Sequence, residues 1–166
     1  MGTPGMPMVP GGGGRRPAPY RGAQPLPQDQ GPKTQWIEDY FAYAVLFSNL
    51  VHGTTQTQAI QIQADSDFKW IKGEYFAVSA GASVTDPQVT AQILDQTNGR
   101  NLFQIPLPVP SVFGIGTLPH IEPVPRIFNA RSAIQFTVAN VDAANDFSSL
   151  WLVLEGTRIF KQGPNT

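Results

Sequence analysis

Two histidines are the residues of this chain best suited to acid–base chemistry or metal binding. His52 precedes a glycine, and His120 lies in a proline-rich segment. Neither has a second imidazole at a metal-ligand spacing such as His-x-x-x-His. We therefore expect both to be plain loop residues.

Two pairs of aspartates could supply oxygen ligands for calcium: Asp65 with Asp67, and Asp142 with Asp146. Neither pair has the remaining residues of a calcium-binding loop. Aspartate is also common in turns, where its side chain accepts hydrogen bonds from nearby backbone. We expect that turn-forming role here.

Motifs for nucleophilic catalysis and for phosphate binding are absent from the sequence. There is no Gly-x-Ser-x-Gly elbow, and the four consecutive glycines at 11–14 lack a preceding strand and the P-loop lysine. Without any cysteine, the chain can form neither a disulfide nor a thiolate metal site. The sequence predicts a non-enzymatic protein with no catalytic residue, no cofactor and no metal.

The three tryptophans raise a different possibility, a carbohydrate-binding platform of exposed aromatic rings on a jelly roll. Trp36 and Trp70 have charged or polar neighbours, so we expect them to be partly exposed. Trp151 lies in an apolar strand and is expected in the core. A sugar-binding module therefore stays open as an alternative function.

Composition divides the chain into an arm, residues 1–34, and a body, residues 35–166. Glycine and proline make up 16 of the 34 arm residues but only 16 of the other 132. Such a segment has too few apolar groups to offset the entropy of ordering its backbone. We expect an extended Pro/Gly-rich arm that is ordered only when it lies on something else.

The arm carries side chains that we expect to bind a partner, and a solvated linker is the alternative role for it. Its charge is +3 against −4 for the rest of the chain. The candidates are three arginines and three apolar or aromatic residues: Arg15, Arg16, Arg21, Met6, Met8 and Tyr20. The arm has only four cations, and nucleic-acid affinity depends on how many phosphates are neutralised, so nucleic acid is a weak candidate for the partner.

The body is predicted to be all-β, a β-sandwich or jelly roll of about eight strands. Its charged content is low, since charged residues make up 14% of the whole chain, so neutral polar side chains must cover its surface. Period-two patterns and turn residues recur at intervals of roughly ten residues. The expected strands are 40–50, 54–64, two pieces within 68–80, 88–97, 100–105, 132–141 and 149–160, with a hairpin at Asn98-Gly99. For 40–50 a helix is the alternative.

Six prolines and two glycines between Pro106 and Pro125 predict a long loop, since proline cannot donate to a strand ladder. Its apolar residues, including Phe113 and Ile115, either cover an edge of their own domain or insert into a neighbouring subunit. The longest apolar run of the chain, 40–47, is too short for a membrane helix, so we expect no membrane partner.

Several motifs together resemble the small β-sandwich virion structural proteins of tailed bacteriophages, of the head decoration, collar or tail accessory type. In chain order they are Ala64-Asp65-Ser66-Asp67-Phe68, Thr97-Asn98-Gly99-Arg100, Pro125-Arg126-Ile127-Phe128 and Leu154-Glu155-Gly156-Thr157-Arg158-Ile159-Phe160. The resemblance covers about 35–160. It implies a location in the virion, a homo-oligomer, and contacts with capsid, portal or neck, or tail proteins. A carbohydrate-binding module for host recognition and a nucleic-acid-contacting coat protein are the alternatives.

Overall fold

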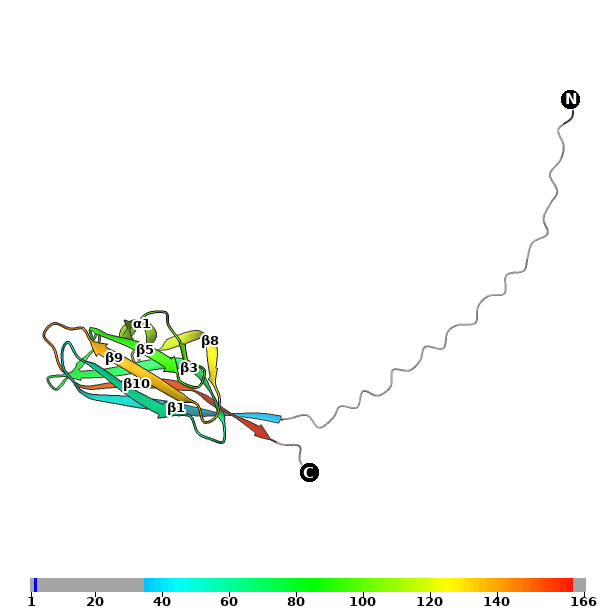
Figure 1. The fold of residues 1–166 in the computed structure, drawn as a ribbon, viewed down its shortest axis with the longest axis horizontal. Coiled ribbons are helices and arrows are strands. Elements are labelled where there is room, and N and C mark those ends of the chain that lie inside the picture. The colour runs from blue at the N-terminus through cyan, green and yellow to red at the C-terminus, as the bar shows by residue number, and fades with distance from the viewer. Residues whose placement is uncertain (1, 3–34, 163–166) are drawn as a thin grey trace. The chain divides into compact units, whose positions relative to one another are not determined.

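The computed structural model describes Gly2 and residues 35–162. These residues form an all-β sandwich of two antiparallel sheets with five strands each (Figure 1). The predicted fold class is confirmed. The arm at 1–34, except Gly2, lies outside the described residues, as does the C-terminal segment 163–166.

The first sheet, sheet A, contains both ends of the described domain. Its strand order is β1–β10–β3–β4, and β8 pairs with the same edge of β3 as β4 does. The strands are β1 Gln35–Leu50, β3 Asp67–Ser79, β4 Ala82–Val84, β8 His120–Phe128 and β10 Phe147–Gln162.

The second sheet, sheet B, packs against the inner face of sheet A. Its order is β2–β9–β5–β6, and β7 also pairs with β5. The strands are β2 Thr55–Gln61, β5 Val89–Asp95, β6 Arg100–Asn101, β7 Leu107–Pro108 and β9 Ala133–Asn140. A short helix, α1 Val109–Val112, directly follows β7. Successive long strands alternate between the two sheets, as in a jelly roll.

Most of the predicted strands are present, with shifted ends. The run at 40–50 is a strand, and it begins earlier, at Gln35. The two pieces expected within 68–80 are one continuous strand, β3. The Asn98-Gly99 hairpin is confirmed, but its returning strand is only two residues long. Asp95 holds that turn by accepting hydrogen bonds from the backbone N–H of Thr97 at 3.0 Å and the side chain of Asn98 at 2.6 Å.

The prediction of a long loop over Pro106–Pro125 is wrong at both ends, because β7 and α1 occupy 107–112 and β8 begins at His120. Residues 120–128 form strand β8, at the edge of sheet A. The pairing with β3 breaks between the pairs Trp70–Arg126 and Lys72–Ile121, and Pro123 and Pro125 lie in that break. An edge strand tolerates proline there because no ladder hydrogen bond is required from it.

A β-bulge in sheet A brings two backbones unusually close. The β10–β3 register shifts between Glu155 and Gly156. A Cβ atom at Gly156 would lie 1.8 Å from the carbonyl oxygen of Lys69, so only glycine fits. The bulge increases the local twist where β1 and β10 approach the ends of the domain.

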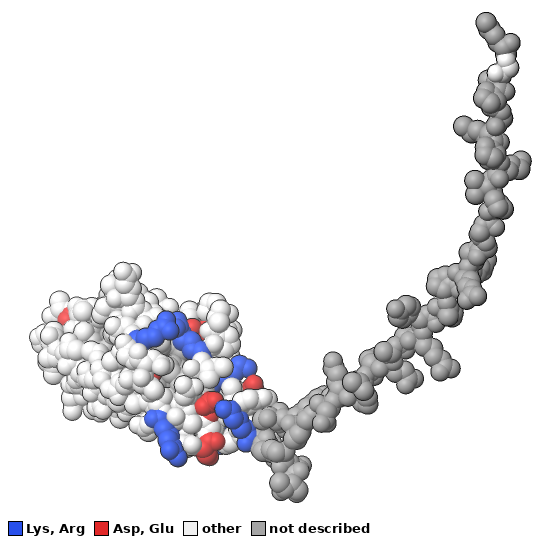
Figure 2. All heavy atoms as spheres, turned by 45° about the vertical axis from the view of Figure 1, so that its right-hand side comes forward, with Lys and Arg blue, Asp and Glu red and all other residues white. Residues whose placement is uncertain are grey.

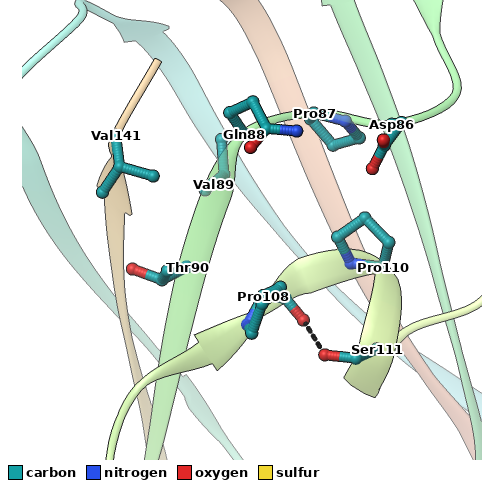
Figure 3. A pocket seen from close by; sticks show the side chains of 9 residues that line it. All are labelled: Asp86, Pro87, Gln88, Val89, Thr90, Pro108, Pro110, Ser111 and Val141. Atoms are coloured by element: carbon teal, nitrogen blue, oxygen red, sulfur yellow. Dashed lines mark hydrogen bonds between the residues drawn. The ribbon is translucent and has the colours of Figure 1, made fainter. Parts of the chain in front are cut away.

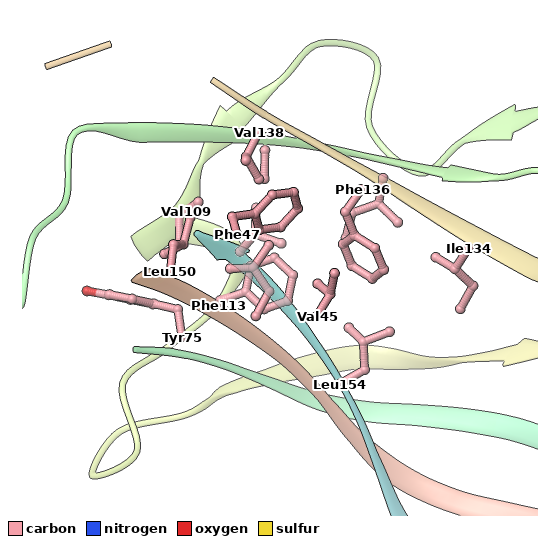
Figure 4. Close-up of a cluster of buried hydrophobic side chains, with 14 of the residues drawn as sticks. Val45, Phe47, Tyr75, Val109, Phe113, Ile134, Phe136, Val138, Leu150 and Leu154 are labelled. Carbon is pink, nitrogen blue, oxygen red and sulfur yellow. The ribbon is translucent and has the colours of Figure 1, made fainter. Parts of the chain in front are cut away.

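The core lies between the sheets and combines aliphatic and aromatic side chains (Figure 4). Alternate residues of β5 and β9 point into it, which is the period-two pattern that predicted these strands. Trp70 and Phe113 are fully buried and stack with ring centroids 6.2 Å apart. The Trp70 indole donates a 2.7 Å hydrogen bond to the Lys72 carbonyl, which satisfies its polar atom.

Within the described part of the chain, no helix is long and apolar enough to cross a membrane.

Candidate interaction surface

The two outer faces of the sandwich differ sharply in chemistry. On sheet B, the outward positions of the three longer strands hold mainly threonine, glutamine and alanine: Thr55, Thr57, Ala59, Gln61, Thr90, Gln92, Leu94, Ala133, Gln135, Thr137 and Ala139. On sheet A, exposed aromatic side chains appear instead. All the exposed large aromatics of residues 35–162 belong to β1, β3 and β10: Trp36, Tyr40, Phe76 and Trp151.

Three of the apolar side chains of sheet A form a row across three adjacent strands. Leu46 of β1 lies opposite Trp151 of β10, and Trp151 lies opposite Phe76 of β3. Trp151 is 39% exposed and Phe76 is 53% exposed, while Leu46 is half-buried. We call this set, the two aromatic residues Trp151 and Phe76 together with Leu46, the aromatic row. Val153 and Val78 flank it and are half-buried.

The row points outward because of the strand period. Leu150, Leu152 and Leu154 of β10 are buried between the sheets, so the residues between them face out. The expectation that Trp151 lies in the core is therefore wrong. Trp70 is fully buried, so its expected partial exposure is wrong too, whereas Trp36 is 53% exposed as predicted.

A network of charged side chains adjoins the aromatic row on the same face. Glu155 accepts a 2.7 Å hydrogen bond from the Tyr40 hydroxyl and lies 2.8 Å from the Lys72 ammonium. Lys72 also lies 3.4 Å from a carboxylate oxygen of Glu74, which is two residues from Phe76 on β3. Two carboxylates thus share one ammonium, which leaves a net negative charge beside the row.

Glu155 stays ionised in this network. Burial alone would raise the pKa of its carboxyl, but the hydrogen bonds from Lys72 and Tyr40 outweigh burial and hold the pKa below its ordinary value. The same contacts raise the pKa of the Lys72 ammonium and of the Tyr40 phenol. At neutral pH these shifts favour the ionised Glu155 carboxyl, the protonated Lys72 ammonium and the neutral Tyr40 phenol.

A second ion pair continues the network toward the start of β1. Glu38 accepts a hydrogen bond from the Thr157 hydroxyl at 3.0 Å and lies 3.3 Å from the Lys69 ammonium. These contacts lower the pKa of the Glu38 carboxyl. In Figure 2, acidic and basic side chains gather toward the end of the domain where β1 begins, while the rest of the visible face of the domain is nearly uncharged.

The two histidines lie in different elements of the fold. His52 is in a turn, as expected, and its Nδ1 lies 2.8 Å from Asp146, which also accepts the His52 backbone N–H. That backbone hydrogen bond and the ring contact lower the pKa of Asp146. His120 is the first residue of β8 rather than a loop residue. The His52–Asp146 pair ties the β1–β2 turn to the start of β10.

Of the four aspartates expected in turns, Asp142 bonds its own turn, whereas Asp67 is the first residue of β3. Asp142 accepts hydrogen bonds from the backbone N–H groups of Ala144 and Asn145 at 2.9 and 3.0 Å. Asp67 accepts one from the backbone of Ala130 at 2.8 Å. Within residues 35–162, no three His, Asp or Glu side chains are grouped so that they could hold a metal ion.

One pocket of about 320 Å³ lies beside α1 (Figure 3). The Ser111 hydroxyl at its rim donates a 2.7 Å hydrogen bond to the Pro108 carbonyl, so it caps its own turn. Asp86 is the one titratable side chain in the lining. The pocket residues are Asp86, Pro87, Gln88, Val89, Thr90, Pro108, Pro110, Ser111 and Val141. This lining offers no acid–base pair.

The predicted partner-binding residues divide into two groups. Those of the arm lie outside the described residues: Met6, Met8, Arg15, Arg16, Tyr20 and Arg21. Phe113 is fully buried in the core of its own domain, and Ile115 packs against that core. Both side chains therefore pack on their own domain.

Comparisons with known proteins identify no family. No protein-family model matches the chain, and no curated protein is similar to it. Among solved structures, the chain is similar to a protein in the crystal structure of the infectious bursal disease virus VP2 subviral particle, with 13% identity and a TM-score of 0.30. The match covers 80% of this chain and 38% of the VP2 chain, so the chain spans well under half the length of that protein. A likeness of this size does not assign a family.

Proposed function

We propose that the chain is a non-enzymatic structural subunit that assembles with copies of itself and with other proteins of a virion. The observation that carries the assembly proposal is the difference between the two outer faces. Exposed aromatic side chains collect on sheet A, while sheet B is coated with threonine and glutamine. Aromatic residues are enriched in protein interfaces, and apolar surface gains free energy when a partner removes it from water.

The virion part of the proposal rests on the resemblance of the strand-end and turn motifs to small phage structural proteins. The confirmed β-sandwich agrees with that resemblance. Capsid, portal or neck, and tail proteins are the proposed partners, and the arm is proposed to contact neighbouring subunits. We do not propose a nucleic-acid partner, because residues 35–162 hold eleven acidic and seven basic side chains.

The oligomeric state of the full-length chain tests the assembly proposal. Sedimentation velocity over a range of concentrations should show a defined oligomer larger than one chain. Trp151→Ala should weaken this oligomer, while Thr55→Ala, on the outer face of sheet B, should leave it intact. A chain that stays monomeric at all accessible concentrations and binds no virion protein would refute the proposal. Mass spectrometry of purified virus particles tests the virion location.

A carbohydrate-binding module is the second candidate, and one observation favours it. Trp151 and Phe76 are adjacent and exposed on the outer face of sheet A, and exposed aromatic rings can stack on sugar rings. A glycan array separates the two candidates. Binding to a defined glycan that is lost in Trp151→Ala, with the oligomer unchanged, would favour the sugar-binding function.

A further inference from the structure

The aromatic row is a small platform whose width can be compared with an extended peptide. It crosses three neighbouring strands, β1, β10 and β3. Strands are about 4.8 Å apart, so the row spans about 10 Å. A polyproline II segment rises about 3.1 Å per residue, so three residues of it cover about the same distance.

Negatively charged side chains lie at one edge of the platform. Glu74 is two residues from Phe76 on the same strand and face, and it shares the Lys72 ammonium with Glu155. One ammonium between two carboxylates leaves a net negative charge next to exposed aromatic rings. Surfaces that bind proline-rich peptides combine the same two features, exposed aromatic rings for the prolines and acidic groups for a flanking arginine.

A segment of this chain outside the described residues has the complementary chemistry. Residues 15–21 read Arg-Arg-Pro-Ala-Pro-Tyr-Arg, with two prolines between three arginines and no acidic residue. Proline fixes φ near the polyproline II value and so lowers the entropy lost on binding. The 13 residues between Arg21 and Gln35 can span up to roughly 45 Å, which is long enough to bring residues 15–21 to another copy beside the start of β1.

We propose that the aromatic row of one copy binds the Arg15–Arg21 segment of a neighbouring copy. This inference rests on the proposed assembly and names the surface that receives the arm. The prolines stack on Trp151 and Phe76, and an arginine pairs with Glu74. Since apolar stacking and ion pairing both contribute, salt weakens the contact without abolishing it.

The absence of cysteine from the chain makes a cross-linking test unambiguous. One full-length copy, carrying a size tag, has Ala18→Cys in the arm. The other has Ser149→Cys, two residues from Trp151 on the same face of β10. After mixing and mild oxidation, we expect a disulfide-linked pair of one tagged and one untagged chain. Adding Trp151→Ala to the untagged copy should lower its yield about tenfold, since loss of a central aromatic anchor typically costs that much affinity.

Two controls decide the outcome. Thr57→Cys on the outer face of sheet B should give only background cross-linking, and Thr55→Ala on that same face should not lower the yield. Equal yields from Ser149→Cys and Thr57→Cys would overturn the inference, as would disulfides formed only within single chains. Sedimentation of the same samples separates the two proposals. An oligomer without this cross-link refutes the arm–row contact alone, while the absence of any oligomer refutes the proposed assembly as well.

Discussion

Trp151 and Phe76 lie directly opposite each other on β10 and β3, and both side chains point out of the sandwich. Their neighbours along the strands, Leu150, Leu152, Tyr75 and Ala77, are all buried. The same two strands therefore build the core with one face and an aromatic surface with the other. Substitutions on the buried face should mainly lower the stability of the domain. Substitutions on the exposed aromatic face should mainly weaken assembly.

The first prediction contrasts two tryptophans of sheet A. Trp151→Ala should change the free energy of unfolding by only about 0.5–1 kcal/mol, because the ring is partly solvent-exposed in the domain. Trp70→Ala should cost about 3–5 kcal/mol, because it leaves a cavity beside Phe113. Urea denaturation of both variants at a concentration where the chain is monomeric checks this. Equal losses would mean that Trp151 belongs to the core.

The second prediction concerns the close backbone approach at the bulge. Gly156→Ala should destabilise the domain by about 1–3 kcal/mol or more, because the new methyl group overlaps the Lys69 carbonyl. Gly116→Ala is the matched control, since its nearest neighbour is a Glu74 side-chain oxygen at 3.8 Å. Thermal melts of the two variants should differ clearly. A Gly156→Ala protein as stable as the control would contradict the register shift between Glu155 and Gly156.

The third prediction follows the protonation of Glu155. Its pKa in the folded chain lies below the ordinary value because the hydrogen bonds from Lys72 and Tyr40 outweigh the effect of burial. The unfolded chain therefore takes up this proton first as the pH falls, so the network stabilises the domain at neutral pH and loses that effect as the pH falls through the folded pKa. Glu155→Gln should be less stable than the natural chain at pH 7, and the difference should narrow toward pH 3. Urea denaturation across this range measures it, and a constant difference would argue against the network.

The fourth prediction concerns metal. We expect chelation with EDTA to leave the far-UV β-sheet signal and the melting temperature unchanged. The physical reason is that the turn aspartates already use their oxygens on protein donors, as Asp142 does with Ala144 and Asn145. Circular dichroism with and without chelator, followed by addition of Ca²⁺, is the measurement. A rise in melting temperature with added Ca²⁺ would reveal a site that these contacts do not account for.

Much of the fold could be predicted from local patterns, because buried and exposed residues alternate along a strand whose one face is in the core. The sequences of β5 and β9 show this alternation, and the Asn98-Gly99 dipeptide marks the turn after β5. Strand β8 was missed because its prolines argue against pairing, and only the position of the strand at a sheet edge, beside a register break, makes them acceptable.

The aromatic row could not be predicted, for a different physical reason. Both faces of β10 are apolar near Trp151, so a period of two does not say which face is buried. For Trp70 the error is the reverse, because the side chain was expected to be partly exposed and is buried. Its polar neighbours Lys69 and Lys72 face outward while the indole points inward, so the composition around it gave the wrong answer. The pairing of Leu46, Trp151 and Phe76 depends on the register between three strands, which a single sequence does not contain.

The last prediction concerns the arm as a whole. Deletion of residues 1–34 should leave a soluble domain with an unchanged β-sheet signal, because the core of the sandwich is formed by residues between Val45 and Leu154. The truncated chain should assemble poorly, because it lacks the segment proposed to cross to a neighbour. A substituted arm in which Arg15, Arg16 and Arg21 are all serine isolates the charge contribution. Its assembly should be intermediate at low salt and should depend less on salt than that of the natural chain, since the screened ion pairs are gone. Sedimentation of the three proteins at two salt concentrations is the measurement. If all three assemble equally well, the arm is a passive extension and sheet A must bind its partner without it.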